Sequence, residues 1–372
     1  MIFFMVMPAM VGGFGNFSII KPHIVYTFKY INDENKSKIL QDMSSQSTMQ
    51  KIKNLKRFGP YLAGLIEGDG TFAIKDPKNA SQTSKYNPHI IVVFKIADKE
   101  LANFLCEITG CGKVYEHNNR NYVLWQITRI LDVYVIVSVI NGYMRTPKYE
   151  TLMRYADWYN NYVSSSDCKS IINVQKLSIL PIDKSCITSN NWLTGFVDAD
   201  GHFAISITKR SNGKARIITR FALEQRINYH RDTGINVKSS YSSIILCISE
   251  VLLGSMYTRS RMKNDKTYYS FIVIAFSKDS KLKIIEYFDR FPLWSSKYHD
   301  YISWKKIVLE QISGLSVNDK AISLRKDFNN TRTTLSWEHL NIRTILSFIN
   351  VVAVFSVMKT YNVTICGKLL KP

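Results

Sequence analysis

Two nine-residue stretches decide the fold of this chain: LAGLIEGDG at residues 62–70 and LTGFVDADG at residues 193–201. Both run from apolar and small residues into an acid, a small residue and Asp-Gly, and both follow an aromatic residue. The interval from Asp69 to Asp200 is 131 residues (200 − 69). Self-similarity at one long interval is typical of a duplicated subdomain, so the sequence predicts two related halves.

Further matching pairs occur in the same order along the chain. Residues 94–99 (FKIADK) match residues 221–226 (FALEQR), and residues 143–149 (YMRTPKY) match residues 292–298 (PLWSSKY). Three pairs in one order favour duplication over chance.

The composition indicates a folded, strongly basic protein. The chain has 372 residues, 46% of them hydrophobic, which is enough for two domains with sizeable cores. Lys and Arg number 49 against 29 Asp and Glu, and the net charge of +20 favours a polyanionic partner such as nucleic acid. The six cysteines show no paired short spacing, which argues against a zinc site and favours free thiols in a reducing compartment.

Changes in composition divide the chain into six parts. The apolar, Gly-rich stretch 1–16 is too short to span a bilayer and lacks a basic signal-peptide region, so we expect no stable membrane association. It closely resembles an interior segment of cytochrome c oxidase subunit I, which implies a mitochondrial intron product that resides in the mitochondrion. The parts are an exon-like leader 1–16, a linker 17–55 with little fixed structure, a first repeat 56–163, an inter-repeat linker 164–191, a second repeat 192–313 and a C-terminal extension 314–372.

Hydrophobic periodicity predicts the same order of elements in both halves: helix, two strands, helix, two strands and closing helices. In the first half, a helix at 100–109 ends before Gly110, a residue type common after helix C-termini. The apolar run 345–358 in the tail is too short for a membrane span and favours a buried or partner-facing helix.

Each motif predicts a helix with one face almost free of side chains. Gly64 and Gly68 are four residues apart, as are Gly195 and Ala199, and this spacing places both members of a pair on the same helix face. Two such strips allow two helices to pack more closely than the usual ~8–10 Å between axes.

Parallel packing of these strips would bring Asp69 and Asp200 to the same end. Two adjacent carboxylates at helix C-termini repel each other and face the negative ends of the helix dipoles, and divalent cations remove both penalties. Mg²⁺ (or Mn²⁺) prefers oxygen ligands, so we predict a metal site at Asp69 and Asp200 with the adjoining Gly68 and Ala199. Such a site would lower the pKa of an attacking water and stabilise the leaving oxygen of a phosphodiester. Two copies in matching frames disfavour the alternative of ordinary helix-ending Asp residues.

With these motifs, residues 56–313 resemble the LAGLIDADG homing endonuclease family in its single-chain, two-repeat form. The resemblance implies an α+β fold of two pseudo-symmetric αββαββα repeats with a central two-helix interface. It also implies that each repeat carries an antiparallel DNA-binding sheet that lies in the major groove. The family's metal-binding acid falls on Asp69 and Asp200, and the less directly catalytic acids fall on Glu67 and Asp198.

The same resemblance implies four further catalytic residues. Polar residues near the metal-bound water fall on Asp98 and Gln225, where Asp98 departs from the more common Gln or Asn. The basic active-site residues fall on Lys148 and Lys297. A lysine beside the scissile phosphate would stabilise transition-state charge or orient a water, and a solvated surface role is the alternative.

Strands with alternating polar side chains can enter the major groove as β-ribbons and read base edges. Basic residues near predicted strand and hairpin edges are therefore candidates for DNA contact, with solvated loops as the alternative. The second-half candidates are Lys209, Arg210, Lys214, Arg216, Arg220, Arg259, Arg261, Lys263 and Lys266, and their first-half counterparts are Lys75, Lys78 and Lys85. DNA binding should weaken steeply with salt.

The sequence thus predicts a monomeric, site-specific homing endonuclease that cuts double-stranded DNA by a two-aspartate, divalent-metal mechanism and promotes intron mobility. The leading alternative is an RNA maturase that binds its own group I intron RNA and assists splicing. A membrane-associated oxidase fragment is a third hypothesis, supported only by residues 1–16. Intact Asp69 and Asp200 favour cleavage, because RNA binding alone does not need them.

Overall fold

A computed structural model of the chain describes residues 48–74, 87–164, 176–209, 215–229, 239–315, 318–326 and 335–341. From Ile52 onward the described residues belong to one compact unit. No helix within these described ranges is long and apolar enough to cross a membrane. The predicted helix at 345–358 lies outside the described residues.

Within the two repeats, the described helices follow the predicted order, and the structure adds α4 before the first repeat and α13 after the second. In the first half they are α4 (Thr48–Leu55), α5 (Gly59–Asp69), α6 (Lys99–Thr109), α7 (Ile130–Ile140) and α8 (Tyr149–Ser164). In the second half and the tail they are α9 (Trp192–Asp200), α10 (Ser242–Val251), α11 (Lys278–Arg290), α12 (Lys297–Ile312) and α13 (Asn318–Lys326). Helix α6 ends where Gly110 adopts a left-handed conformation with φ 55°, as the sequence predicts.

Each half contains a four-stranded antiparallel sheet. The first consists of β1 (Gly70–Ala73), β2 (His89–Lys95), β3 (Lys113–His117) and β4 (Tyr122–Ile127), in the order β1-β2-β4-β3. The second consists of β5 (Gly201–Lys209), β6 (Ala215–Arg226), β7 (Ser255–Lys263) and β8 (Lys266–Ala275), in the order β5-β6-β8-β7. The matching strand order confirms the predicted α+β class and the pair of pseudo-symmetric repeats.

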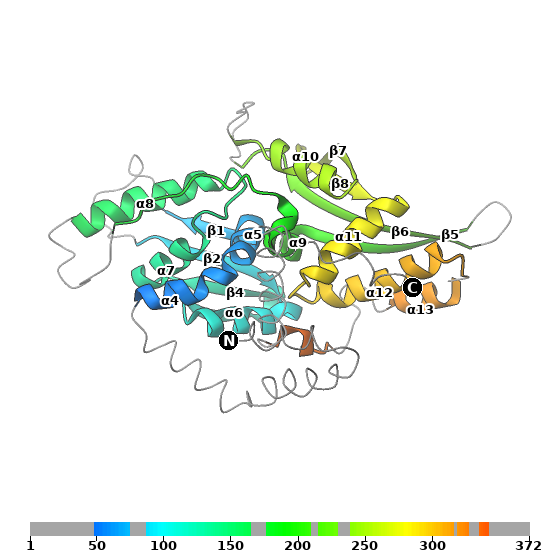
Figure 1. The fold of residues 1–372 in the computed structure, drawn as a ribbon, viewed down its shortest axis with the longest axis horizontal. Coiled ribbons are helices and arrows are strands. Elements are labelled where there is room, and N and C mark those ends of the chain that lie inside the picture. Colours follow the sequence, from blue (N-terminus) through cyan, green and yellow to red (C-terminus); the bar gives the residue numbers. More distant parts are fainter. Residues whose placement is uncertain are drawn as a thin grey trace, which may run out of the picture. The chain divides into compact units, whose positions relative to one another are not determined.

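Helices pack against each sheet. In the first half α6 contacts β2, β3 and β4, and α7 contacts β2; in the second half α10 contacts β7 and β8, and α12 contacts β5 and β6. Alternate strand residues are buried, including Trp125 in β4 and Phe221 in β6. Helices α5 and α9 lie side by side between the two sheets (Figure 1). Because every second residue of a strand points into the core, the side chains between them form a second face of each sheet, which is available for a ligand.

Two of the expected linkers contain fixed structure. The described end of linker 17–55 is helix α4, in which the apolar Leu55 is buried. Residues 17–47 lie outside the described residues. In the inter-repeat linker, the stretch around Ser178 and Leu180 packs on the first half, because the Asn141 side chain bonds the Ser178 carbonyl oxygen and the Leu180 N–H, each at 2.8 Å.

Candidate functional site

The two motif helices touch along the predicted small-residue strips. A Cβ atom built on Gly64 would lie 2.0 Å from the carbonyl oxygen of Trp192, and one built on Gly195 would lie 2.1 Å from that of Tyr61. These reciprocal contacts pair the N-terminal parts of both helices, so α5 and α9 run parallel. Neither glycine can gain a side chain without displacing the partner backbone.

The two motif aspartates meet at the C-terminal end of this interface. A Cβ atom built on Gly68 would lie 2.2 Å from the Cβ of Ala199 and 3.4 Å from Oδ2 of Asp200. Burial, followed by the charge of Asp200, raises the pKa of Asp69 to about 6. Burial also raises the pKa of Asp200. Both side chains are half-buried, so this is a pair of crowded carboxylates still open to a ligand.

The preceding acid of the first motif is structural. The buried Glu67 carboxylate accepts the backbone N–H groups of Arg145, at 2.9 Å, and Thr146, at 2.6 Å. It also accepts Nε1–H of Trp192, the residue that begins the second motif helix, at 2.6 Å. Glu67 therefore links its own half to the opposite motif helix.

The second half repeats this arrangement. The Asp198 carboxylate accepts the backbone N–H groups of Trp294, at 2.9 Å, and Ser295, at 3.3 Å, and the Ser295 hydroxyl at 2.6 Å. Tyr61, which lies in the first motif helix, donates its hydroxyl to Asp198 at 2.9 Å. The two halves are thus fastened by reciprocal hydrogen bonds that the sequence motif alone does not reveal.

Lys148 lies at the end of the first motif helix. Its Nζ donates to the carbonyl oxygens of Ile66, Gly68 and Gly70 at 3.1, 3.0 and 2.6 Å. A cation among the last carbonyls of a helix is favourable because it complements the negative end of the dipole. Burial, followed by the charge of Arg226, lowers the pKa of Lys148 to about 8.

Lys297 occupies the equivalent place in the second half. Its Nζ donates to the carbonyl oxygens of Val197, Asp198 and Ala199 at 3.1, 2.7 and 2.6 Å, and burial lowers its pKa. An ammonium has three N–H donors, so these three bonds engage all of them. The matching geometry supports the predicted pairing of Lys148 with Lys297, while a direct bond from either lysine to a phosphate would require releasing a carbonyl.

The predicted pairing of Asp98 with Gln225 is out of register. Strand pairing preserves the interval of 131 residues between halves, so the counterpart of Gln225 is the buried Phe94 (225 − 131). Gln225 Nε2 donates to Oδ2 of Asp200 at 3.0 Å, next to the candidate metal site. Asp98 instead accepts the backbone N–H of Ser296 at 2.7 Å and joins the two halves. The match between residues 94–99 and 221–226 is therefore wrong. Its first residues, Phe94 and Phe221, are not equivalent, because the counterpart of Phe221 is Ile90, four positions before Phe94.

The described candidates for DNA contact share one face of the second sheet. Paired residues in antiparallel strands point to the same side, and this side is opposite to the buried Phe221 and Val273. We call it the basic face, and its exposed basic residues are Arg216, Arg220 and Arg226 in β6, Arg259, Arg261 and Lys263 in β7, and Lys266 in β8.

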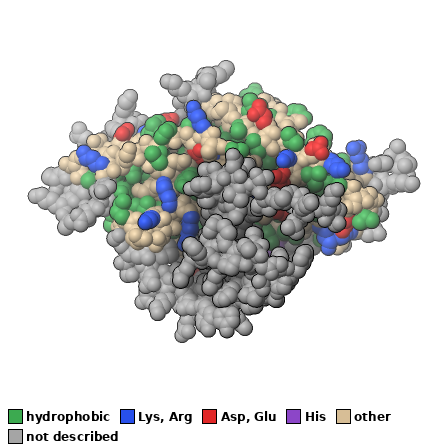
Figure 2. Space-filling model, viewed as in Figure 1, with side chains coloured by type: hydrophobic (Ala, Val, Ile, Leu, Met, Phe, Trp, Pro, Cys, Tyr) green, Lys and Arg blue, Asp and Glu red, His purple; other side chains and the backbone are tan. Residues whose placement is uncertain are grey.

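Several predicted contacts cannot be placed. The side chains of Lys75, Lys78, Lys85, Lys209, Arg210 and Lys214 lie outside what the structure describes. Arg226 was not among the sequence-based candidates, although strand alternation from Arg216 and Arg220 points to it. Acidic and basic side chains are interspersed on the side of the molecule in Figure 2, whereas Glu224 is the single acid among the described residues of the basic face.

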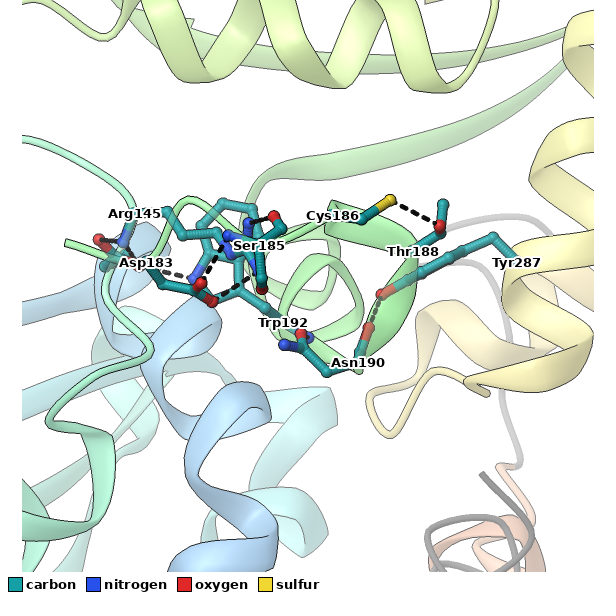
Figure 3. Close-up of polar contacts among 9 residues, drawn as sticks. Arg145, Asp183, Ser185, Cys186, Thr188, Asn190, Trp192 and Tyr287 are labelled. Atoms are coloured by element: carbon teal, nitrogen blue, oxygen red, sulfur yellow. Dashed lines mark hydrogen bonds and ion pairs between the residues drawn. The ribbon is translucent and has the colours of Figure 1, made fainter. Parts of the chain in front are cut away.

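The segment that joins the two halves is anchored near the start of the second motif helix (Figure 3). Buried Arg145 forms an ion pair with Asp183 at 2.6 Å and donates to the Ser185 carbonyl oxygen and hydroxyl at 2.5 and 2.8 Å. Farther along, Tyr287 donates its hydroxyl to the Asn190 carbonyl oxygen at 2.9 Å. The repeat pattern does not reveal Arg145, because its counterpart in the matching segment 292–298 is Trp294 rather than a basic residue.

Comparison with known proteins bears on the identity of this site. The model of the LAGLIDADG endonuclease family matches residues 62–161 and 193–308. The intron-encoded DNA endonuclease aI3 of Saccharomyces cerevisiae is 40% identical over 357 residues, which is 91% of this chain and 82% of that protein. An uncharacterized cox1 intron-2 protein of 37.2 kDa from Schizosaccharomyces pombe is 30% identical over 286 residues, which is 75% of this chain and 76% of that protein.

A solved structure shows the same fold. The LAGLIDADG homing endonuclease I-GzeII, in complex with its DNA target, superposes with a TM-score of 0.54 at 17% identity. The superposition covers 74% of this chain and 99% of that one.

Proposed function

The chain belongs to the LAGLIDADG endonuclease family, and from this premise we propose that it cuts double-stranded DNA at a specific site. The observation that carries the proposal is the pair of half-buried carboxylates, Asp69 and Asp200, at the adjacent ends of two touching helices. The basic face of the second sheet supplies the positive charge that a DNA backbone requires. The endonuclease aI3 and the DNA-bound I-GzeII support the same assignment.

The acids fit a divalent cation. Burial raises the pKa values of Asp69 and Asp200, and the charge of Asp200 adds to the effect on Asp69, so the cation-free site stores unfavourable charge that a cation would relieve. Their hard oxygen ligands suit Mg²⁺ or Mn²⁺. The carbonyl oxygens of Gly68 and Ala199, the other two predicted ligands, already accept bonds from Lys148 and Lys297, so each would bind a cation through its remaining lone pair. A divalent ion held by these acids would supply Lewis-acid activation of water and of the leaving oxygen.

The surrounding side chains hold these carboxylates in place. Gln225 Nε2 donates to Oδ2 of Asp200 and restrains that carboxylate, while its own carbonyl oxygen accepts the Arg226 N–H at 2.9 Å. Lys148 and Lys297 fix the last turn of each motif helix and add positive charge beside the acids. We assign both lysines as positioning residues, and Asp69 and Asp200 as the metal-binding catalytic residues. Asp98 joins the two halves, and its catalytic role stays a prediction.

We further infer that the protein is encoded within a mitochondrial intron and acts in the mitochondrion as a monomer. The resemblance of residues 1–16 to a cytochrome oxidase exon and the cox1 intron origin named for the S. pombe relative support this context. Two acids from the two halves of one chain form the site, which supports a single-chain enzyme. Light scattering of the purified protein, with and without DNA, tests the monomeric state.

Cleavage of intronless target DNA tests the main proposal. The purified full-length protein is incubated with Mg²⁺ and a duplex that spans the uninterrupted exon junction, and we expect one double-strand break. Asp69→Asn and Asp200→Asn should abolish cutting, whereas Asp157→Asn, at an exposed position on α8, should not. A parallel assay with precursor RNA completes the experiment. Splicing activity that survives Asp69→Asn, with no DNA cleavage by the unmodified protein, would replace the nuclease assignment with a maturase.

A further inference from the structure

The basic face holds two of its arginines in a fixed relation. On β6, the Glu224 carboxylate accepts a hydrogen bond from Arg259 Nη1 at 3.3 Å and from Arg261 Nη2 at 2.6 Å, both on β7. It also accepts the Ser270 hydroxyl at 2.6 Å. Glu224 is only 25% exposed, whereas the arginine side chains are 49% and 56% exposed. The carboxylate therefore anchors the two guanidinium groups from below and leaves them at the surface.

An anchored guanidinium is suited to reading guanine. Each guanidinium carries five N–H donors, and the bonds above use one donor of Arg259 and one of Arg261. Guanine presents two acceptors in the major groove, N7 and O6, and their spacing matches two donors of one guanidinium. Restraint by Glu224 lowers the conformational entropy that each arginine loses on binding.

The corresponding face of the first sheet has different chemistry. By the same pairing logic it consists of odd-numbered residues in β1, β2 and β3 and even-numbered residues in β4. Its polar side chains, which flank the centre, include His89, Lys95, Lys113, His117 and Gln126. At its centre, Val93 of β2 pairs with Leu124 of β4, which pairs with Tyr115 of β3. Val93 and Tyr115 are 42% and 45% exposed. We call this the apolar face after the three residues at its centre, Val93, Leu124 and Tyr115.

The two faces also differ in charge. Among the described strand residues, the apolar face carries two basic side chains, Lys95 and Lys113, against seven on the basic face. Thymine is the base that offers a methyl group in the major groove, and apolar side chains contact it favourably. The side chains of Val93 and Leu124 have no acceptor or donor with which to select guanine or cytosine.

We propose that the two sheets read chemically different half-sites: the basic face selects guanine through Arg259 and Arg261, and the apolar face selects thymine through Val93, Leu124 and Tyr115. The inference rests on the proposed function, since it names the substrate of the same endonuclease. The target is therefore a duplex whose two half-sites differ in base composition, with G·C pairs concentrated on one side of the cut and A·T pairs on the other.

Selection from a randomised duplex library tests the proposal. Full-length protein is equilibrated with the library in Ca²⁺ in place of Mg²⁺, bound DNA is sequenced, and the cut position is then mapped in Mg²⁺. We expect G·C enrichment on one side of the cut and A·T enrichment on the other. Two half-sites of equal composition would overturn the inference and leave the endonuclease assignment intact. A pool with no selected sequence would overturn both.

Variants assign each half-site to its sheet. Arg259→Ala and Arg261→Ala should each lower discrimination at one or two G·C positions by about tenfold, without changing selection on the A·T side. Val93→Ser should relax thymine selection on the other side only. Lys283→Ala removes an exposed basic residue from α11, outside both faces, and is the matched control for loss of charge. Arginine variants that weaken binding to all sequences equally and reduce the salt dependence would identify phosphate contacts and overturn the proposal.

Discussion

Replacing Asp69 with Asn should stabilise the cation-free protein while abolishing cleavage. Burial, and then the nearby Asp200 charge, raises the pKa of Asp69 from an ordinary 3.8 to about 6 in the folded state. Above pH 6 the ionised carboxylate therefore costs folding free energy, at most about 3 kcal/mol for the full difference. Because the side chain is half-buried and solvent screens part of the repulsion, we expect Asp69→Asn to gain roughly 1–2 kcal/mol.

The sign of the pH dependence follows from the same shift. Between pH 3.8 and 6 the folded protein holds a proton on Asp69 that the unfolded chain releases. Falling pH through this window therefore removes the penalty, and the stability gap between Asp69→Asn and the unmodified protein should close near pH 4. Added Mg²⁺ should also narrow the gap at pH 8, because a cation that binds the folded site stabilises only the unmodified protein.

Urea unfolding in EDTA at pH 8 and pH 4, and in Mg²⁺ at pH 8, measures the gain in stability of Asp69→Asn, its loss at low pH and its reduction by the cation. Asp198→Asn is the matched control: the pKa of Asp198 is also raised to about 6 by burial, but its carboxylate accepts bonds from Tyr61, Trp294 and Ser295. An amide there cannot accept them all, so this variant should lose stability. A less stable Asp69→Asn at pH 8, or a gap that is the same at both pH values, would refute the reasoning.

Three further predictions concern the same region. Gly64→Ala should lose about 1–3 kcal/mol in urea unfolding and most of its cleavage rate, because its Cβ would lie 2.0 Å from the Trp192 carbonyl oxygen. The control Gly314→Ala, strained at φ 76° but with no atom within 4 Å of its Cβ, should lose stability and keep its rate; equal rates in the two variants would contradict a tight interface. Trp192→Phe should cost about 1–3 kcal/mol of unfolding free energy because Glu67 loses a buried donor, and unchanged stability would exclude that bond as important. The single-turnover cleavage rate should fall below pH 6 as Asp69 is protonated, and a tenfold rise in Mg²⁺ should move this limb to lower pH; a limb insensitive to Mg²⁺ would point to another group.

Features with a local sequence signal were predicted well. The repeated motif and its spaced small residues predict the contact between α5 and α9, and the Lys-Tyr matches locate Lys148 and Lys297. Alternation within strands places the described basic candidates on one face of β6, β7 and β8. The small-residue strips and the basic face depend on periodicity within one element, and the two lysines depend on a match between two short segments of the chain.

By itself, the sequence determined the duplicated architecture, the two motif helices and the acids at their ends, because spacing along one helix or strand dictates which side chains share a face. Only the tertiary structure decided which partner each polar group meets. Phe94 rather than Asp98 is the counterpart of Gln225, Glu224 holds Arg259 and Arg261, and the motif lysines use their donors on carbonyl oxygens. These pairings depend on strand register and on contacts between residues distant in the chain, where a shift of a few positions changes every partner while the local pattern stays the same.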